Sequence, residues 1–336
     1  MANNVSTLGL NLGIISRTKS LQGQMADLQA QVATGVKYQT FGEYGSNAQR
    51  IQEYRTSLTT IDIYRQNIDI SLSNIEQMDS AIEETIEQAK GALSSITIQL
   101  ERGSEFDLVA VKTAAQAALK VIEANMNVRI GDRYLFAGTD VSNEPYTGSS
   151  TVTANMQTQI ADWLDGTNTT TQLLSNIDNL TDSQLGYSVS VQTAKNIFVR
   201  ADDSLEVDYT VKANDDGFSK IVAGLNALAN LEEPGTGDIP TRDEFYDVVD
   251  SLYRTVKAGI DGLRDSSSDI ALASETINTI KNNLTEDKQA YQKVMEQTEA
   301  TDVTDAIVRF QSMQTQLDAS FRISAILGQL SLTRIL

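Results

Sequence analysis

The chain has 336 residues, a formal net charge of −19 and 40% hydrophobic residues, which allows two or more domains. The acidity argues against nucleic-acid phosphates and anionic lipid surfaces as partners, and the apolar content argues against disorder. Cysteine and histidine are both absent. Disulfides, thiolate metal sites and the commonest general base are therefore excluded. No run of 18 apolar residues occurs, so we expect no membrane insertion. The first residues also lack the features of a cleaved secretory signal peptide.

The N-terminal stretch has the spacing of an amphipathic helix. Its apolar residues follow one another at steps of seven, four, three and four. Chain ends are usually poorly ordered unless something holds them, so an apolar helical end predicts a partner surface. The stripe consists of Ile14, Leu21, Met25, Leu28 and Val32.

A much longer heptad pattern follows. Ser46–Gln49 resembles a capping box at its start, and Gly103 is expected at its end. A helix of this length would extend roughly 70 Å at 1.5 Å per residue, and the unbroken seam is typical of a coiled coil. The seam is Ile51, Leu58, Ile61, Ile68, Leu72, Ile75, Ile82, Ile86, Ala89, Leu93 and Ile96.

A second helix is predicted directly afterwards. Residues 104–107 can cap it and Gly131 should stop it. Short connections between helices favour antiparallel neighbours. One face carries Leu108, Val111, Ala115, Ala118, Ile122 and Met126.

The middle of the chain, residues 131–240, contains all three prolines and differs from both flanks. Proline costs about 3 kcal/mol inside a helix, so the proline-free flanks favour helices and the middle favours irregular structure. Alternating apolar residues predict strands there. The predicted strands are Tyr134–Phe136, Tyr187–Val191 and Leu205–Val211, and Ile221, Leu225, Leu228 and Leu231 suggest a short helix.

The C-terminal flank is again helical in pattern. Thr241–Glu244 forms a second capping box after Pro240, and apolar stripes continue from Phe245 to Val294. The last stretch, residues 303–336, stays amphipathic to its end. Its apolar residues include Ile307, Phe310, Leu317, Phe321, Leu327, Leu330, Leu332 and Leu336.

These patterns predict a mainly α fold with an elongated antiparallel coiled-coil rod built from both chain ends. The expected domains are an N-terminal helical arm at 1–130, an inserted small α+β outer domain at 131–240 and a C-terminal helical arm at 241–336. An ordinary globular helical bundle is the alternative, but the seams are longer than globular helices usually are.

Three segments give the chain a resemblance to bacterial flagellin-type axial proteins, most closely the hook-associated (hook–filament junction) proteins of the FlgL family. Leu28–Gly35 is similar to the family's N-terminal "L…SG" segment. Gly131–Asp140, followed by Pro145-Tyr146, is similar to the entry into the family's outer domain. Leu317–Leu332 resembles the shared flagellin-type ending. Lys37–Ser46 lacks the stretch usual in flagellins, which favours the junction protein.

The resemblance implies a structural, non-enzymatic subunit without cofactor or metal that joins hook to filament in the extracellular flagellum. The implied partners are copies of the chain in a tubular assembly, other axial proteins such as hook-associated protein and flagellin, and a cytoplasmic export chaperone on the C-terminal helix. Export would use the flagellar type III apparatus. The predicted assembly interface is formed by the two terminal stripes named above, and the domain-entry motif by Tyr134, Leu135, Phe136 and Gly138.

Several alternatives stay open. The chain could be flagellin itself, or more remotely a soluble signalling coiled coil. The Gly42–Gly45 turn is either a plain connection or a hinge or interface loop. Asp202-Asp203 and Asp215-Asp216 lack the ligand spacing of an EF-hand, which favours solvated turns over calcium sites. No phosphate loop or nucleophile elbow is present, which argues against an enzyme.

Overall fold

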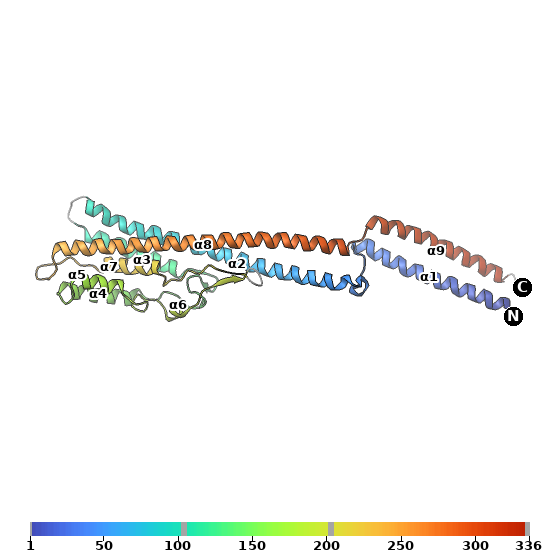
Figure 1. Ribbon diagram of the computed structural model, residues 1–336, viewed down its shortest axis with the longest axis horizontal. Coiled ribbons are helices and arrows are strands. Elements are labelled where there is room, and N and C mark those ends of the chain that lie inside the picture. Colours follow the sequence, from blue (N-terminus) through green and yellow to red (C-terminus); the bar gives the residue numbers. More distant parts are fainter. Residues whose placement is uncertain (1, 102–105, 201–204, 333–336) are drawn as a thin grey trace. The chain divides into compact units, whose positions relative to one another are not determined.

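A computed structural model describes residues 2–101, 106–200 and 205–332, with backbone alone at 2–8, 10, 11, 98–101, 149 and 327–332. These residues form long helices and two small two-stranded antiparallel sheets (Figure 1). The prediction of a mainly α chain with a small α+β part is confirmed. Contacts divide the chain into two compact units. Unit 1 comprises residues 1–62 and 284–336, and unit 2 comprises residues 63–283.

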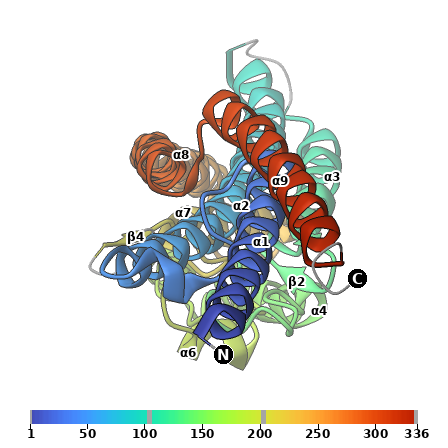
Figure 2. The same cartoon turned by 90° about the vertical axis from the view of Figure 1, so that its right-hand side faces the viewer.

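Unit 1 brings the two ends of the chain together. Helices α1 (Ala2–Thr34) and α9 (Val303–Leu332) lie side by side and antiparallel, with both termini at the same end of the pair (Figures 1 and 2). The unit also contains the 3₁₀ helix η1 (Phe41–Tyr44), the start of α2 (Asn47–Glu101) and the end of α8 (Arg242–Glu299).

The predicted heptad seam of α2 is buried along its length, with Leu58 and Leu72 half-buried. Ion pairs join α2 to α8 in each unit. In unit 1, Lys288 Nζ lies 2.6 Å from Asp62 Oδ1, and in unit 2, Lys281 Nζ lies 2.7 Å from Asp69 Oδ1. Within unit 2, the Ser267 hydroxyl also donates to Asp79 Oδ1 at 2.6 Å, so residue numbers fall on α8 as they rise on α2 and the two helices run antiparallel there. The buried seam residues are Ile51, Ile61, Ile68, Ile75, Ile82, Ile86, Ala89, Leu93 and Ile96.

The core of unit 2 is built around α7. Every residue from 221 to 229 is buried, as expected for a helix that is covered on all sides. Three further helices of the unit contact it besides α8. The elements are α3 (Leu108–Met126), α4 (Ser149–Leu164), α5 (Thr170–Asp178) and α7 (Asp216–Asn230). The sequence predicted the last helix but not α4 or α5.

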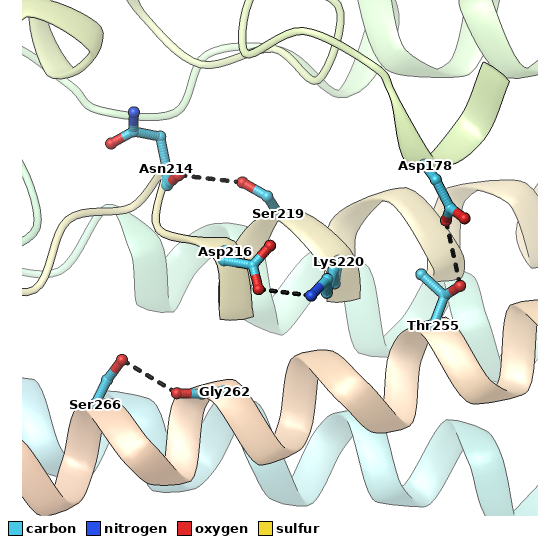
Figure 3. Close-up of polar contacts among 8 residues, drawn as sticks. All are labelled: Asp178, Asn214, Asp216, Ser219, Lys220, Thr255, Gly262 and Ser266. Atoms are coloured by element: carbon cyan, nitrogen blue, oxygen red, sulfur yellow. Dashed lines mark hydrogen bonds and ion pairs between the residues drawn. The ribbon is translucent and has the colours of Figure 1, made fainter. Parts of the chain in front are cut away.

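Glycines allow α7 to approach α8 closely. A Cβ added at Gly259 of α8 would lie 2.8 Å from the carbonyl oxygen of Gly217 and 2.7 Å from Ile221 Cγ1. No side chain larger than hydrogen fits there without moving a helix. Figure 3 shows polar contacts around α7 and α8, including the ion pair from Lys220 to Asp216 at 2.6 Å.

The sheets are shorter than predicted. Strand β1 (Arg129–Ile130) pairs with β2 (Arg133–Tyr134), and β3 (Phe198–Arg200) pairs with β4 (Glu206–Asp208). The predicted strand Tyr187–Val191 is wrong, because the chain forms helix α6 (Val189–Thr193) there. The Ser188 hydroxyl accepts a hydrogen bond from Val191 N at 3.4 Å and so caps that helix.

The predicted helix starts agree with the structure better than the predicted strands do. The capping box at Thr241 is present: its hydroxyl accepts from Glu244 N at 3.2 Å, and its N–H donates to Glu244 Oε2 at 2.7 Å. These hydrogen bonds hold the pKa of Glu244 below its ordinary value. Asp107 caps α3 by accepting from Ala110 N at 3.0 Å. Gly103, predicted to end α2, lies outside the described residues.

Candidate assembly interface

The facing stripes of α1 and α9 hold the two chain ends together. On α1, Leu28 is 8% exposed, and the other predicted stripe residues are half-buried. On α9, Ala306 is 2% exposed, and Met313 is half-buried between Phe310 and Leu317 in the stripe. Ala306 and Met313 were not predicted from the sequence, although both fit the steps of four, three and four. The inner stripe therefore consists of Ile14, Leu21, Met25, Leu28, Val32, Ala306, Phe310, Met313 and Leu317.

Two of the predicted interface residues lie elsewhere. Ile307 is 40% and Phe321 49% exposed, so neither belongs to the inner stripe. Other large apolar side chains of the two helices are exposed with them, on more than one side of α9, and we call this set the outer stripe. It comprises Leu12, Ile15, Val303, Ile307, Val308, Phe321, Ile323 and Ile326. Of the remaining predicted residues, the side chains of Leu327, Leu330 and Leu332, and the whole of Leu336, lie outside the described structure.

The segments that follow α1 and precede α9 are joined by backbone hydrogen bonds. Lys37 N donates to Glu299 O at 2.8 Å, and Thr301 N donates to Gly35 O at 2.9 Å, around an antiparallel bridge between Val36 and Ala300. Gly35 has a φ of 71°, which places it in the left-handed region that glycine adopts easily. The base of the terminal pair is thus fixed by backbone pairing.

An aromatic turn adjoins these hydrogen bonds. The Arg55 guanidinium lies 4.7 Å from the Phe41 ring centre, and one of its nitrogens lies 2.8 Å from Glu299 Oε1. Partial burial raises the pKa of Tyr44, whose hydroxyl donates to Tyr38 O at 3.3 Å. The Gly42–Gly45 turn is therefore anchored at its aromatic residues. Its use as a hinge or interface remains a prediction.

The two units differ in charge. Unit 1 contains 10 Lys and Arg residues against 11 Asp and Glu residues, a net charge of −1. Unit 2 contains 16 against 34, a net charge of −18. Nearly all of the chain's net negative charge therefore belongs to unit 2. Copies of the terminal unit can approach one another without the repulsion that a strongly acidic surface would cause.

The predicted domain-entry motif forms part of the core of unit 2. Phe136 is fully buried against Phe218, with ring centres 5.3 Å apart, and Leu135 is 5% exposed. Gly138 has a φ of 60°, and a Cβ there would lie 2.8 Å from Lys195 O. Tyr134 is half-buried. This geometry favours a packing role over a contact surface.

The described residues contain no cluster of three or more acidic side chains that could hold a metal ion. Asp215 Oδ2 accepts from Lys212 N at 2.8 Å, and Asp216 pairs with Lys220. The exposed pair of Asp216 agrees with a solvated turn, whereas Asp215 is half-buried, and Asp202-Asp203 lies outside the described residues. Among the described helices, none is long and apolar enough to cross a membrane.

No known protein family and no curated protein matches the sequence. Solved structures align with the chain, including the following two. One is a protein from Vibrio parahaemolyticus, provisionally assigned as a flagellar hook-associated protein. It aligns with a TM-score of 0.54 at 12% identity, over 75% of this chain and 97% of that chain. The other, FlgL from Bacillus cereus, aligns with a TM-score of 0.48 at 17% identity, over 73% of this chain and 98% of its own. The resemblance predicted from the sequence motifs is confirmed at the level of fold.

Proposed function

We propose that the chain is a structural subunit of the bacterial flagellum that joins hook to filament and assembles through the paired helices α1 and α9. The observation that carries the proposal is the double apolar surface of this pair. The inner-stripe residues of α1 and α9 cover one another within one chain. In the outer stripe, Ile15 is 64% and Phe321 49% exposed. Exposed apolar side chains repeated along one helix pair are typical of a surface that packs against another protein.

Copies of the chain are the expected partners of the outer stripe. Burial of apolar area stabilises association by about 25 cal/mol per Å² before entropy losses are counted. The near-neutral charge of unit 1 adds little repulsion to this gain. The fold likeness to the Vibrio protein supports a hook-associated role. Flagellin and other axial proteins are the further partners in this proposal.

The proposal also includes a route out of the cell. Before assembly, the outer stripe of α9 would be exposed in the cytoplasm, and a chaperone bound to that helix would shield it. We infer export through the flagellar type III apparatus and an extracellular location. Deleting residues 307–336 should abolish chaperone binding, whereas removing residues 140–215 should leave it. Co-purification of the chaperone with each variant measures this difference.

Two other functions make different predictions. Flagellin would grow into long fibres when seeded, whereas a junction protein should cap hook ends and stop until flagellin is added. A soluble signalling coiled coil would form a stable dimer and cap nothing. An enzymatic role has no support in the chemistry of the chain, since it lacks histidine and cysteine.

The test uses purified full-length chain mixed with isolated hooks, read by electron microscopy and sedimentation. We expect capped hook ends that then accept flagellin. Deleting residues 317–336 should abolish capping, and Phe321→Ser with Ile15→Ser should weaken it. The matched control is Phe198→Ser with Val189→Ser, which removes side chains of comparable exposure from unit 2. Capping that survives the deletion, or long fibres from the chain alone, would contradict the proposal.

A further inference from the structure

A groove between α2 and α8 of unit 2 has a chemistry unlike the rest of that unit. It encloses about 300 Å³, and Leu93 and Ile260, each less than one-tenth exposed, contribute its apolar floor. Three cations line it, namely Lys90, Lys257 and Arg264, together with Tyr253 and two hydroxyl side chains. Among the described residues, none that lines this groove is acidic.

This composition is unusual for its surroundings. Unit 2 has 34 Asp and Glu residues against 16 Lys and Arg residues, so an average patch would be acidic. Glu87 and Asp261 pair with two of the three cations, which leaves an excess of one positive charge over an apolar floor. Such a groove attracts anionic groups, and its walls reduce the screening of the charges.

The cations of the groove can take up a new partner. Lys90 pairs with Glu87 at 2.5 Å on α2, and Arg264 pairs with Asp261 at 2.7 Å on α8. In each pair the side chains are exposed and the two residues are three positions apart. Exposed pairs of this kind contribute little to stability, so their cations are readily shared. In the described part of the chain, Lys257 has no ion pair.

We propose that this groove binds carboxylate side chains from unit 2 of a second copy of the chain. The inference rests on the proposed function, which brings copies together. Adjacent copies would each carry a net charge of −18 in this unit, and like charges placed opposite one another are costly. A cationic groove offsets that repulsion at one position and thereby selects the register of the neighbour. Its volume suits one or two acidic side chains and not a whole helix.

Zero-length carbodiimide cross-linking of the full chain tests the proposal, because this reagent joins a lysine amine only to a carboxylate in contact with it. Equal amounts of ¹⁴N- and ¹⁵N-labelled chain are mixed, both concentrated in solution and assembled on hooks. Mass spectrometry then separates links between copies from links within one copy, such as Lys90 to Glu87. We expect mixed-isotope links from Lys90 and Lys257 to acidic residues of unit 2.

Variants show whether the groove itself is responsible. Arg264→Gln keeps both amines and removes one cation, so the mixed-isotope links should fall several-fold. Arg254→Gln is the matched control, because Arg254 lies on the same helix in an exposed pair with Asp250 at 2.7 Å. It should leave the links unchanged. Equal effects of the two variants would show general electrostatics and overturn the proposal.

The remaining outcomes separate this proposal from the proposed function. Capped hooks without mixed-isotope links from Lys90 or Lys257 overturn the groove proposal and leave the proposed function standing. Links in concentrated solution without capping support the groove and contradict the function. Links from these lysines only to hook proteins would assign the groove to another partner and overturn the second-copy proposal. The absence of both links and capping overturns both.

Discussion

Unit 1 and unit 2 differ in how much of their apolar surface is covered within one chain. In α1 and α9 only Leu28 and Ala306, among the described side chains, are buried, while the outer stripe faces solvent. In unit 2, α7 is buried on every side. A pair of helices can cover one stripe on each partner, whereas several layers of helices can enclose a core. Unit 2 therefore has an enclosed core, although side chains such as Val109 and Leu272 are exposed on it, whereas unit 1 has only a two-helix seam.

The charge distribution follows the same division. Unit 2 carries a net charge of −18, and unit 1 a net charge of −1. An acidic, closed unit resists nonspecific association, and a neutral, open unit permits contact. We therefore expect the two units to respond independently to substitutions.

The largest effect is expected for Phe136→Ala in unit 2. Removing this fully buried ring should cost about 3–5 kcal/mol, because it leaves a cavity against Phe218. The chain's single tryptophan, Trp163, is 1% exposed in the same unit and reports urea unfolding by fluorescence. The exposed control Phe198→Ala should change stability by less than about 0.5 kcal/mol. Equal acceleration of amide exchange in α1 would show that the units are not independent.

The second effect concerns the terminal pair. Leu28→Ala should lower the stability of the α1/α9 pair by about 2 kcal/mol. This is the low end for a Leu→Ala truncation, because two helices can partly close around the space that the side chain leaves. Hydrogen exchange in α1 and α9 should accelerate while the Trp163 transition stays in place. Leu12→Ala, at a side chain 59% exposed, is the control and should alter neither. An unchanged exchange rate for Leu28→Ala would show that Leu28 does not stabilise the packing of α1 against α9.

Alanine substitutions at two helix glycines should have smaller effects on stability, and the two effects should differ in sign. Gly259→Ala should destabilise unit 2 by about 1 kcal/mol, because a clash with Gly217 O outweighs the gain in helix propensity. Gly91→Ala has no atom within 4 Å of the new methyl group. It should stabilise its helix by about 0.5–1 kcal/mol. Urea unfolding of both variants measures the contrast, and stabilisation by both would show that α7 and α8 are less close than described.

The smallest effect is a pH dependence. Burial raises the pKa of Asp215 above its ordinary value of 3.8. Its stabilising contribution is therefore complete below the unfolded-state pKa and is lost as the pH rises through the folded-state pKa. Asp215→Asn should thus gain stability relative to the wild type between pH 3 and 7. Glu244→Gln should show the opposite trend, since the pKa of Glu244 is lowered. Urea midpoints across this range test both signs, and parallel curves for the two variants would contradict them.

The long-range pattern of the chain was predictable because coiled-coil seams and caps are local. Ile51 to Ile96 repeat in heptads, and the capping box at Thr241 needs only four residues. The strand predicted at Tyr187–Val191 failed for a local reason as well, since Ser188 caps a short helix. Helices α4 and α5 were missed because their Thr- and Asn-rich sequences have low helix propensity. They are stabilised by tertiary contacts with α7.

The sequence by itself determined that both chain ends are apolar helices in need of a partner, because amphipathic spacing is encoded residue by residue. Only the tertiary structure decided which apolar residues face inward. Leu317 lies in the inner stripe and Phe321, one helical turn later, lies outside it. The same holds for the cationic groove, whose lysines and arginine come from helices far apart in the sequence. Spacing fixes the apolar face of each helix, but the rotation of α1 against α9 and of α2 against α8 depends on contacts between distant residues.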